Sequence, residues 1–153
     1  MARKVLLDAN LLIAAFDNNG NTSEEIRATA KNKLTELLSD PDVMFFITPL
    51  IRYEVLRGVN WQRNDDFESL KDILNTFPEL DITRNVSELA ANLFRFERWN
   101  MLQRNDNSRN LDKRKFDIFH FCSANCNNLE LCSNDTDIGK INILHDSYIN
   151  IQN

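Results

Sequence analysis

Short apolar runs alternate with longer stretches in which apolar residues recur every three or four positions. Residues 3–7 end in the run Val5-Leu6-Leu7 and stop at Asp8, and residues 43–48 are continuously apolar. Both patterns predict strands that are buried on both faces. Further short strands are predicted at residues 80–83, 129–132 and 141–144. Helical spacing predicts helices at residues 10–16, 22–38, 49–57, 67–77, 86–101 and 116–126.

Capping residues support two of the predicted helix starts. Thr22 followed by Glu25 fits a capping box. Thr48 before Pro49 fits a helix with proline in its first turn. The polar and basic segment 103–115 is predicted to be a loop or a frayed helix end.

Strands that alternate with helices favour parallel pairing. We therefore predict an α/β fold, in which three α/β/α layers enclose a central, mostly parallel sheet of four to five strands. The chain has 153 residues, which is enough for one hydrophobic core. No linker or repeat interrupts it, so residues 1–153 are expected to form a single domain.

Composition narrows the class of protein. The longest apolar stretch, residues 11–16, is too short to cross a membrane. The N-terminal apolar run breaks at Asp8, unlike a secretory signal, so a cytoplasmic protein is expected. The three cysteines, Cys122, Cys126 and Cys132, form no Cys-x-x-Cys pair and are expected to be reduced thiols.

Acidic residues stand where the chain is predicted to reach one edge of the sheet. Asp8 ends the first strand, and Glu54 lies on the helix that follows the second strand. Asp117 is expected in the first turn of the apolar helix 116–126, and Asp135 and Asp137 follow the strand 129–132. Ligands of open parallel sheets bind at the carboxyl ends of the strands. We therefore expect four of these acids to converge there.

Converging carboxylates need compensation. Two of them about 5 Å apart repel by roughly 3 kcal/mol at an effective dielectric constant near 20, so a group of four needs raised pKa values or a cation. Oxygen-only ligands suit Mg²⁺ or Mn²⁺. Such a cation activates water and neutralises charge in phosphodiester hydrolysis. Its charge also makes a nucleic-acid substrate compatible with the net charge of −5.

Four segments carry a family resemblance. They are residues 5–13 (VLLDANLLI), 48–58 (TPLIRYEVLRG), 116–124 (FDIFHFCSA) and 133–138 (SNDTDI). In order and spacing they resemble the motifs of PIN-domain nucleases, over nearly the whole chain. The chain looks most like the short stand-alone VapC-type members, the ribonuclease toxins of bacterial toxin–antitoxin pairs.

The resemblance implies an endoribonuclease that depends on Mg²⁺ or Mn²⁺ and leaves 5′-phosphate and 3′-hydroxyl ends. It implies that Asp8 and Asp117 are metal ligands and that Glu54 completes the acidic set, directly or through water. Asp135 is the implied fourth acid, with Asp137 as the weaker candidate. The implied partners are an RNA substrate, an antitoxin protein and a second copy of the chain in a homodimer.

Two further residues of these motifs are implied to be polar supports. Asn10 and Ser133 would orient the carboxylates or the substrate. Ser133 stands where the family usually has threonine, which keeps the hydroxyl, and Ile138 stands where it usually has phenylalanine. The segment 103–115 is longer than in the shortest members. None of these departures removes an acid.

Basic and aromatic residues near the motifs are candidate RNA contacts. The basic candidates are Arg52, Arg57, Arg104, Arg109, Lys113, Arg114 and Lys115. A solvated, charged loop explains the later ones equally well, because Asp106 and Asp112 are interspersed. Phe96 and Trp99 are expected to be core or dimer contacts, and Trp61, in a polar stretch, is the plausible exposed aromatic residue. His120 and His145 are expected to be structural.

Two other functions fit parts of this pattern. A catalytically degenerate PIN-like module could use the acidic pocket to receive a partner's arginine, although no acid has been lost. A phosphotransfer enzyme of the haloacid-dehalogenase kind needs Asp-x-Asp after the first strand, and here Asn10 follows in place of the second acid.

Overall fold

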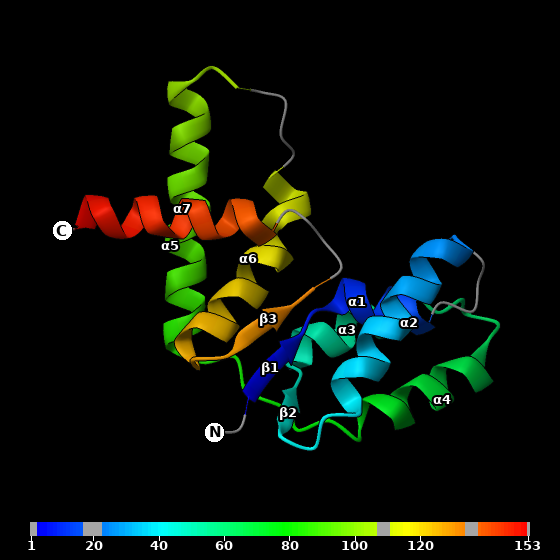
Figure 1. The fold of residues 1–153 in the computed structure, drawn as a ribbon. Coiled ribbons are helices and arrows are strands. Elements are labelled where there is room, and N and C mark those ends of the chain that lie inside the picture. Colours follow the sequence, from blue (N-terminus) through cyan, green and yellow to red (C-terminus); the bar gives the residue numbers. More distant parts are fainter. Residues whose placement is uncertain (1–2, 17–22, 107–110, 134–137, 153) are drawn as a thin grey trace. The chain divides into compact units, whose positions relative to one another are not determined.

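The computed structural model describes residues 3–16, 23–106, 111–133 and 138–152 (Figure 1). Packing divides the chain into two compact units. Unit 1 comprises residues 1–81 and 129–135, and unit 2 comprises residues 82–128 and 136–153. Every strand that the described residues form belongs to unit 1.

Unit 1 is built on a parallel sheet with strand order β2-β1-β3. The strands are β1 (Arg3–Leu7), β2 (Val43–Phe46) and β3 (Glu130–Cys132), and Val5 of β1 lies opposite Phe45 and Glu130. The parallel pairing confirms the predicted fold class. The helices of unit 1 are α1 (Ala9–Phe16), α2 (Glu24–Leu38), α3 (Pro49–Arg57) and α4 (Asn64–Leu74).

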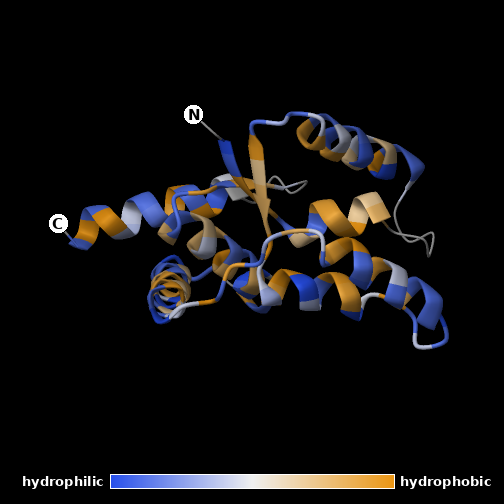
Figure 2. Cartoon of the chain, turned by 90° about the horizontal axis from the view of Figure 1, so that it is seen from below, coloured by the Kyte–Doolittle hydropathy of each residue, from blue (hydrophilic) through white to orange (hydrophobic). Residues whose placement is uncertain are grey.

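The core of unit 1 is centred on β1. Its last three residues, Val5 to Leu7, are completely buried although their side chains point alternately to the two faces of the sheet, so both faces are covered there. Leu11 and Leu12 of α1 are also completely buried. Hydrophobic residues make up most of the strands (Figure 2), although β1 begins with Arg3 and Lys4 and β3 with Glu130. The apolar runs of the sequence therefore mark the interior of this unit.

Side-chain caps fix two helix starts in unit 1. The Thr48 hydroxyl accepts a hydrogen bond from the Ile51 N–H at 3.2 Å, next to Pro49, as the sequence predicts. At the start of α2 the cap is the Ser23 hydroxyl, which accepts from the Ile26 N–H at 3.3 Å. Thr22, the expected cap, lies outside the described residues.

Unit 2 is helical in its described part. It contains α5 (Arg84–Gln103), α6 (Leu111–Cys126) and α7 (Ile138–Gln152). α6 packs along α5, and α7 contacts both helices and crosses α5 in Figure 1. His120 is buried, and the His145 ring packs 5.2 Å from the ring of Phe121, which confirms structural places for both histidines.

Three sequence predictions of structure are wrong. Residues 141–144 form part of α7 instead of a strand, with Ile141 and Leu144 buried and Ile143 exposed, which is helical spacing. Residues 80–83 form no strand, because the chain joins the sheet only through a parallel bridge between Ile47 and Glu79. Finally, α6 starts at Leu111 and not at the predicted Phe116, so it includes the end of the segment predicted to be a loop or a frayed helix end. Runs of three or four apolar residues are too short to separate the two periodicities.

Candidate functional site

Asp8 lies at the carboxyl end of the central strand. Its backbone N–H donates a hydrogen bond to the Cys132 carbonyl oxygen at 2.9 Å, which joins the ends of β1 and β3. The residue is only 1% exposed. A buried carboxylate costs free energy unless hydrogen bonds compensate for its lost hydration. This position therefore needs donors around the carboxylate.

The backbone and a serine hydroxyl both donate to the Asp8 carboxylate. The Ala9 N–H donates to Oδ1 at 2.8 Å, and the Ser133 hydroxyl donates to Oδ2 at 2.7 Å. Hydrogen bonds to a charged acceptor are shorter and stronger than neutral ones. Both donors sit at the edge where β1 and β3 end, so the sheet itself holds this carboxylate in place.

Asn10 completes a three-residue cluster. Its Oδ1 lies 2.8 Å from the Ser133 Oγ. A hydroxyl has one proton, and the charged Asp8 is the stronger acceptor. The Ser133 hydroxyl therefore lies within hydrogen-bond distance of two oxygen acceptors and donates to one of them at a time. The structure thus brings Ser133 to Asp8 and Asn10, which lie 125 and 123 positions before it in the sequence.

Glu54 belongs to the same unit. It is half-buried on α3, directly before the buried Val55. α3 packs against α1, the helix that begins directly after Asp8. The cap and proline at Thr48 and Pro49 set the start of α3 and hence the place of Glu54 along it.

Asp117 belongs to unit 2 and is half-buried on α6, next to the buried Ile118. The sequence predicts Asp117 in the first turn of this helix. The prediction is wrong: α6 starts at Leu111, so Asp117 lies in the second turn. Asp112 occupies the first turn instead, where a carboxylate is favoured by the helix dipole.

The remaining acids cannot be placed in this site. Asp135 and Asp137 lie outside the described residues. Among the residues that the structure does describe, no three His, Cys, Asp or Glu side chains gather as a metal-binding group. The meeting of Asp8, Glu54, Asp117 and Asp135 around one cation therefore stays a prediction.

The donors near Asp8 suit a hard cation. The Asp8 carboxylate, the Asn10 amide and the Ser133 hydroxyl offer oxygen atoms, which Mg²⁺ and Mn²⁺ prefer. Cys132, the residue before Ser133, ends β3, and burial raises the pKa of its thiol. The described chemistry fits the predicted cofactor.

The basic candidates are found in different environments. Arg52 donates to the Glu79 carboxylate and to Asn75 Oδ1, each at 2.8 Å, and so joins α3 to the segment after α4. The Arg57 guanidinium lies over the Tyr53 ring. Lys115 lies over the ring of Phe116, and Arg104 is exposed just after α5. Arg109 and the Lys113 side chain lie outside the described residues.

The Arg114 side chain is mostly buried and is paired with Glu97. Its Nη1 lies 2.9 Å from Glu97 Oε1, and the two side chains are 11% and 4% exposed. Glu97 lies outside the four sequence motifs and is not among the predicted site residues. Its signal is periodic: Ala90, Leu93, Glu97 and Met101 form the buried stripe of α5, so an acid stands among core positions. Arg114 is therefore part of the interior of unit 2 in this structure, although the sequence offered it as an RNA contact.

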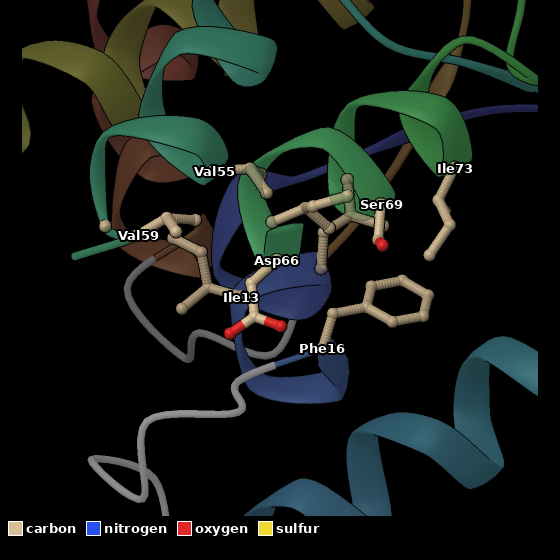
Figure 3. Close-up of a pocket in the computed structure, with 10 residues that line it drawn as sticks. Ile13, Phe16, Val55, Val59, Asp66, Ser69 and Ile73 are labelled. Carbon is tan, nitrogen blue, oxygen red and sulfur yellow. The ribbon is translucent and has the colours of Figure 1, made fainter. Parts of the chain in front are cut away.

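A separate apolar pocket of about 110 Å³ lies between α1, α3 and α4 (Figure 3). Ile13 and Phe16 line it from α1, Val55 from α3 and Ile73 from α4, and the Asp66 carboxylate lies at the same pocket. One carboxylate among aliphatic side chains does not make a phosphodiester site. The pocket suits an apolar group and is distinct in character from the polar cluster at Asp8.

The fold and the Asp8 cluster define a class of protein: a parallel α/β protein with a buried acid at the carboxyl end of its central strand. The family model described as "PIN domain" matches residues 5–144 and so runs through both units. The chain belongs to the PIN-domain family.

Solved structures share this fold at low sequence identity. A chain of VapBC2 from Rickettsia felis, bound to a DNA fragment from its promoter, is 16% identical with a TM-score of 0.60, and the match covers 90% of this chain and 92% of that one. Mycobacterium tuberculosis VapC20, described as a sarcin-ricin loop cleaving toxin, is 15% identical with a TM-score of 0.60, over 89% and 93%. A toxin–antitoxin complex from Klebsiella pneumoniae is 22% identical with a TM-score of 0.56, over 86% and 87%.

A comparison with curated proteins and the hydropathy of the helices add two negative findings. No curated protein matches the sequence. Among the described helices, none is both long enough and apolar enough to cross a membrane.

Proposed function

We propose that this PIN-domain protein is a Mg²⁺- or Mn²⁺-dependent endoribonuclease and the toxin of a toxin–antitoxin pair, acting as a single nuclease domain in the cytoplasm. One observation carries the proposal most directly. The chain buries a carboxylate, Asp8, at the carboxyl end of the central strand and holds it with the Ser133 hydroxyl and the Ala9 N–H. Burial of an acid in a fixed orientation is expensive and suits a ligand for a cation.

The acids proposed to hold the cation are Asp8, Glu54, Asp117 and Asp135, with Asp137 as the alternative to Asp135. When bound, the cation would activate water and neutralise the charge that develops on the scissile phosphate. The chain's own contribution is positioning: Ser133 and Ala9 fix the Asp8 carboxylate, and Asn10 orients the Ser133 hydroxyl.

RNA is the proposed substrate. VapC20, a protein of the same fold, is described as a toxin that cleaves the sarcin-ricin loop, and the four sequence motifs resemble those of ribonuclease toxins. We expect cleavage of single-stranded or loop RNA that leaves 5′-phosphate and 3′-hydroxyl ends. An antitoxin protein is the proposed partner, because matched structures are toxin–antitoxin complexes. A homodimer is the proposed form of the free protein.

The test is RNA cleavage by the purified protein with Mg²⁺, with Mn²⁺ and with EDTA. The wild-type protein should cleave only when a divalent cation is present, and Asp8→Asn should reduce cleavage below detection while its circular dichroism spectrum is unchanged. Asp72→Asn is the matched control, because Asp72 is exposed on α4 of the same unit. Cleavage by Asp8→Asn at the wild-type rate would contradict the proposal. Failure of the wild-type protein to cleave with either metal would favour a degenerate module that binds a partner's arginine.

A further inference from the structure

An open groove of about 610 Å³ runs along α5 and α7 in unit 2. α7 crosses α5 here (Figure 1). The residues that line the groove include Arg95, Phe96, Arg98 and Trp99 from α5 and Tyr148 and Gln152 from α7. All of them belong to one unit, so the groove does not depend on how the two units are placed.

The aromatic residues form a supported platform. The Phe96 and Trp99 rings are stacked, with centroids 6.3 Å apart and an angle of 17° between their planes. Tyr148 meets Phe96 edge-on at 5.9 Å and so braces the platform from α7. Trp99 nevertheless remains 53% exposed. Of the two roles expected from the sequence, a core or a dimer contact, this exposure excludes the core, and the Trp99 ring is available to a ligand.

Positive charge flanks this platform. Arg95 and Arg98 are both exposed, and Arg95 donates a hydrogen bond to the neutral Asn92 side chain at 3.0 Å. No carboxylate lines the groove in the part of the chain that the structure describes. Glu97, the acid between the two arginines in the sequence, is buried on another face with Arg114. The groove is thus a local positive surface on a chain whose net charge is −5.

The positive charge of the groove favours a negatively charged ligand over a second copy of the chain. A second copy seated on this groove through a two-fold axis would bring another Arg95 and Arg98 to the interface, and no carboxylate lines the described groove to offset them. A nucleic-acid strand matches both features instead. Bases stack on exposed aromatic rings and contribute about 1–3 kcal/mol each, while arginines bind the phosphates.

We propose that the groove between α5 and α7 binds single-stranded RNA, with a base stacked on Trp99 and phosphates held by Arg95 and Arg98. This inference rests on the proposed ribonuclease function, whose RNA substrate would occupy the groove. It adds a binding surface whose residues are not among the acidic residues of the sequence motifs.

Binding is measured apart from cleavage, using the full-length Asp8→Asn protein and a short fluorescein-labelled single-stranded RNA whose anisotropy reports the complex. Trp99→Ala should weaken binding by about fivefold to a hundredfold, the equivalent of about 1–3 kcal/mol for a stacked base. Ile151→Ala is the matched control and should leave binding unchanged, because Ile151 is 63% exposed on α7 of the same unit and does not line the groove. Trp99→Phe retains an aromatic ring, so it should recover most of the affinity and also reveals any folding defect of the alanine variant.

Two further measurements make the test specific. Arg98→Gln should lower the slope of log affinity against log salt concentration by about 0.7, the value for one phosphate contact on a single strand. In a Trp61→Phe background, Trp99 is the remaining tryptophan of the two in the chain, and RNA should quench its fluorescence.

The outcomes separate this inference from the proposed function. Equal RNA affinities for Asp8→Asn with and without Trp99→Ala would overturn the groove proposal, even if the wild-type protein cleaves RNA. A protein that fails to cleave but loses RNA binding with Trp99→Ala would uphold the groove and overturn the nuclease. If Trp99→Ala instead converts a dimer to monomers in analytical ultracentrifugation without changing RNA affinity, the surface is an interface between copies and the proposal fails.

Discussion

The Ser133 hydroxyl donates a 2.7 Å hydrogen bond to the Asp8 carboxylate. The two residues end neighbouring parallel strands, and the Cys132 carbonyl that precedes Ser133 accepts the Asp8 N–H. The contact therefore follows from the pairing of β1 with β3. Through this contact the residue after β3 helps to hold the buried carboxylate of Asp8, the residue after β1.

Replacement of Ser133 tests that contact. Ser133→Ala removes a hydrogen bond to a charged group, so the free energy of unfolding should fall by about 1.5–3 kcal/mol. RNA cleavage should fall by roughly tenfold to a hundredfold, as for other residues that orient a metal ligand. Ser133→Thr keeps the hydroxyl and should retain both. Urea unfolding and RNA cleavage provide the measurements, with Ser87→Ala on the surface of α5 as control; an unchanged Ser133→Ala protein would refute the role.

Divalent cations should stabilise the folded protein. A cation that binds only the folded state adds about 2.7 kcal/mol at a hundredfold excess over its Kd, and here it also relieves repulsion among the proposed acids. Mg²⁺ or Mn²⁺ should therefore raise the melting temperature, and EDTA should reverse the rise. Asp8→Asn should lose the shift while Asp72→Asn keeps it. An absence of any shift in the wild-type protein at millimolar metal would count against the cation site.

The Glu97–Arg114 ion pair should be essential for the stability of unit 2. Glu97→Gln leaves the buried Arg114 charge without its partner, and removal of one member of a buried pair costs about 3–5 kcal/mol. The double variant Glu97→Leu/Arg114→Met removes both charges and should cost less than the two single changes together. Urea unfolding of the two single variants and the double variant measures the coupling. Glu68→Gln breaks an exposed pair with Lys71 and should cost under about 1 kcal/mol.

Cysteine reactivity should follow burial. Burial raises the pKa of Cys122 to about 12, so its thiol stays protonated and unreactive at neutral pH, because the thiolate is the nucleophile. Cys132 is also buried with a raised pKa, whereas Cys126 is exposed. A thiol reagent should therefore modify Cys126 first and the other two only after unfolding, as mass spectrometry would show. Cys126→Ser should abolish the fast reaction; if it persists, this account of the thiols is wrong.

The Arg3–Glu130 pair should make stability depend on pH. Arg3 Nε donates a hydrogen bond to Glu130 Oε2 at 2.7 Å. This hydrogen bond lowers the pKa of the Glu130 carboxyl. A lowered folded-state pKa contributes stability above the ordinary carboxyl pKa and loses it as the pH falls through the lowered value. Arg3→Gln should therefore reduce the melting temperature slightly at neutral pH and not at strongly acid pH. Lys4→Gln, at the next and equally exposed position, should show no such pH dependence.

The sequence by itself determined the strand β1, which the structure places at residues 3–7 as predicted. It also determined the start of α3 at Thr48 and Pro49. Both depend on local chemistry: an apolar run that stops at an acid, and a side-chain cap beside a proline. The parallel arrangement followed from the alternation of strands and helices. The same local reasoning failed at residues 141–144, where four residues carry too little periodicity to separate a strand from α7.

Only the tertiary structure decided which distant residues meet. Asp8 and Ser133 are separated by 125 positions, and their contact depends on β3 pairing with β1. Glu97 and Trp99 are two positions apart on α5, yet one is buried against Arg114 and the other is half exposed beside Phe96. The packing of α6 and α7 against α5 makes that difference. Residue type and spacing describe a helix face, but burial depends on which elements cover that face.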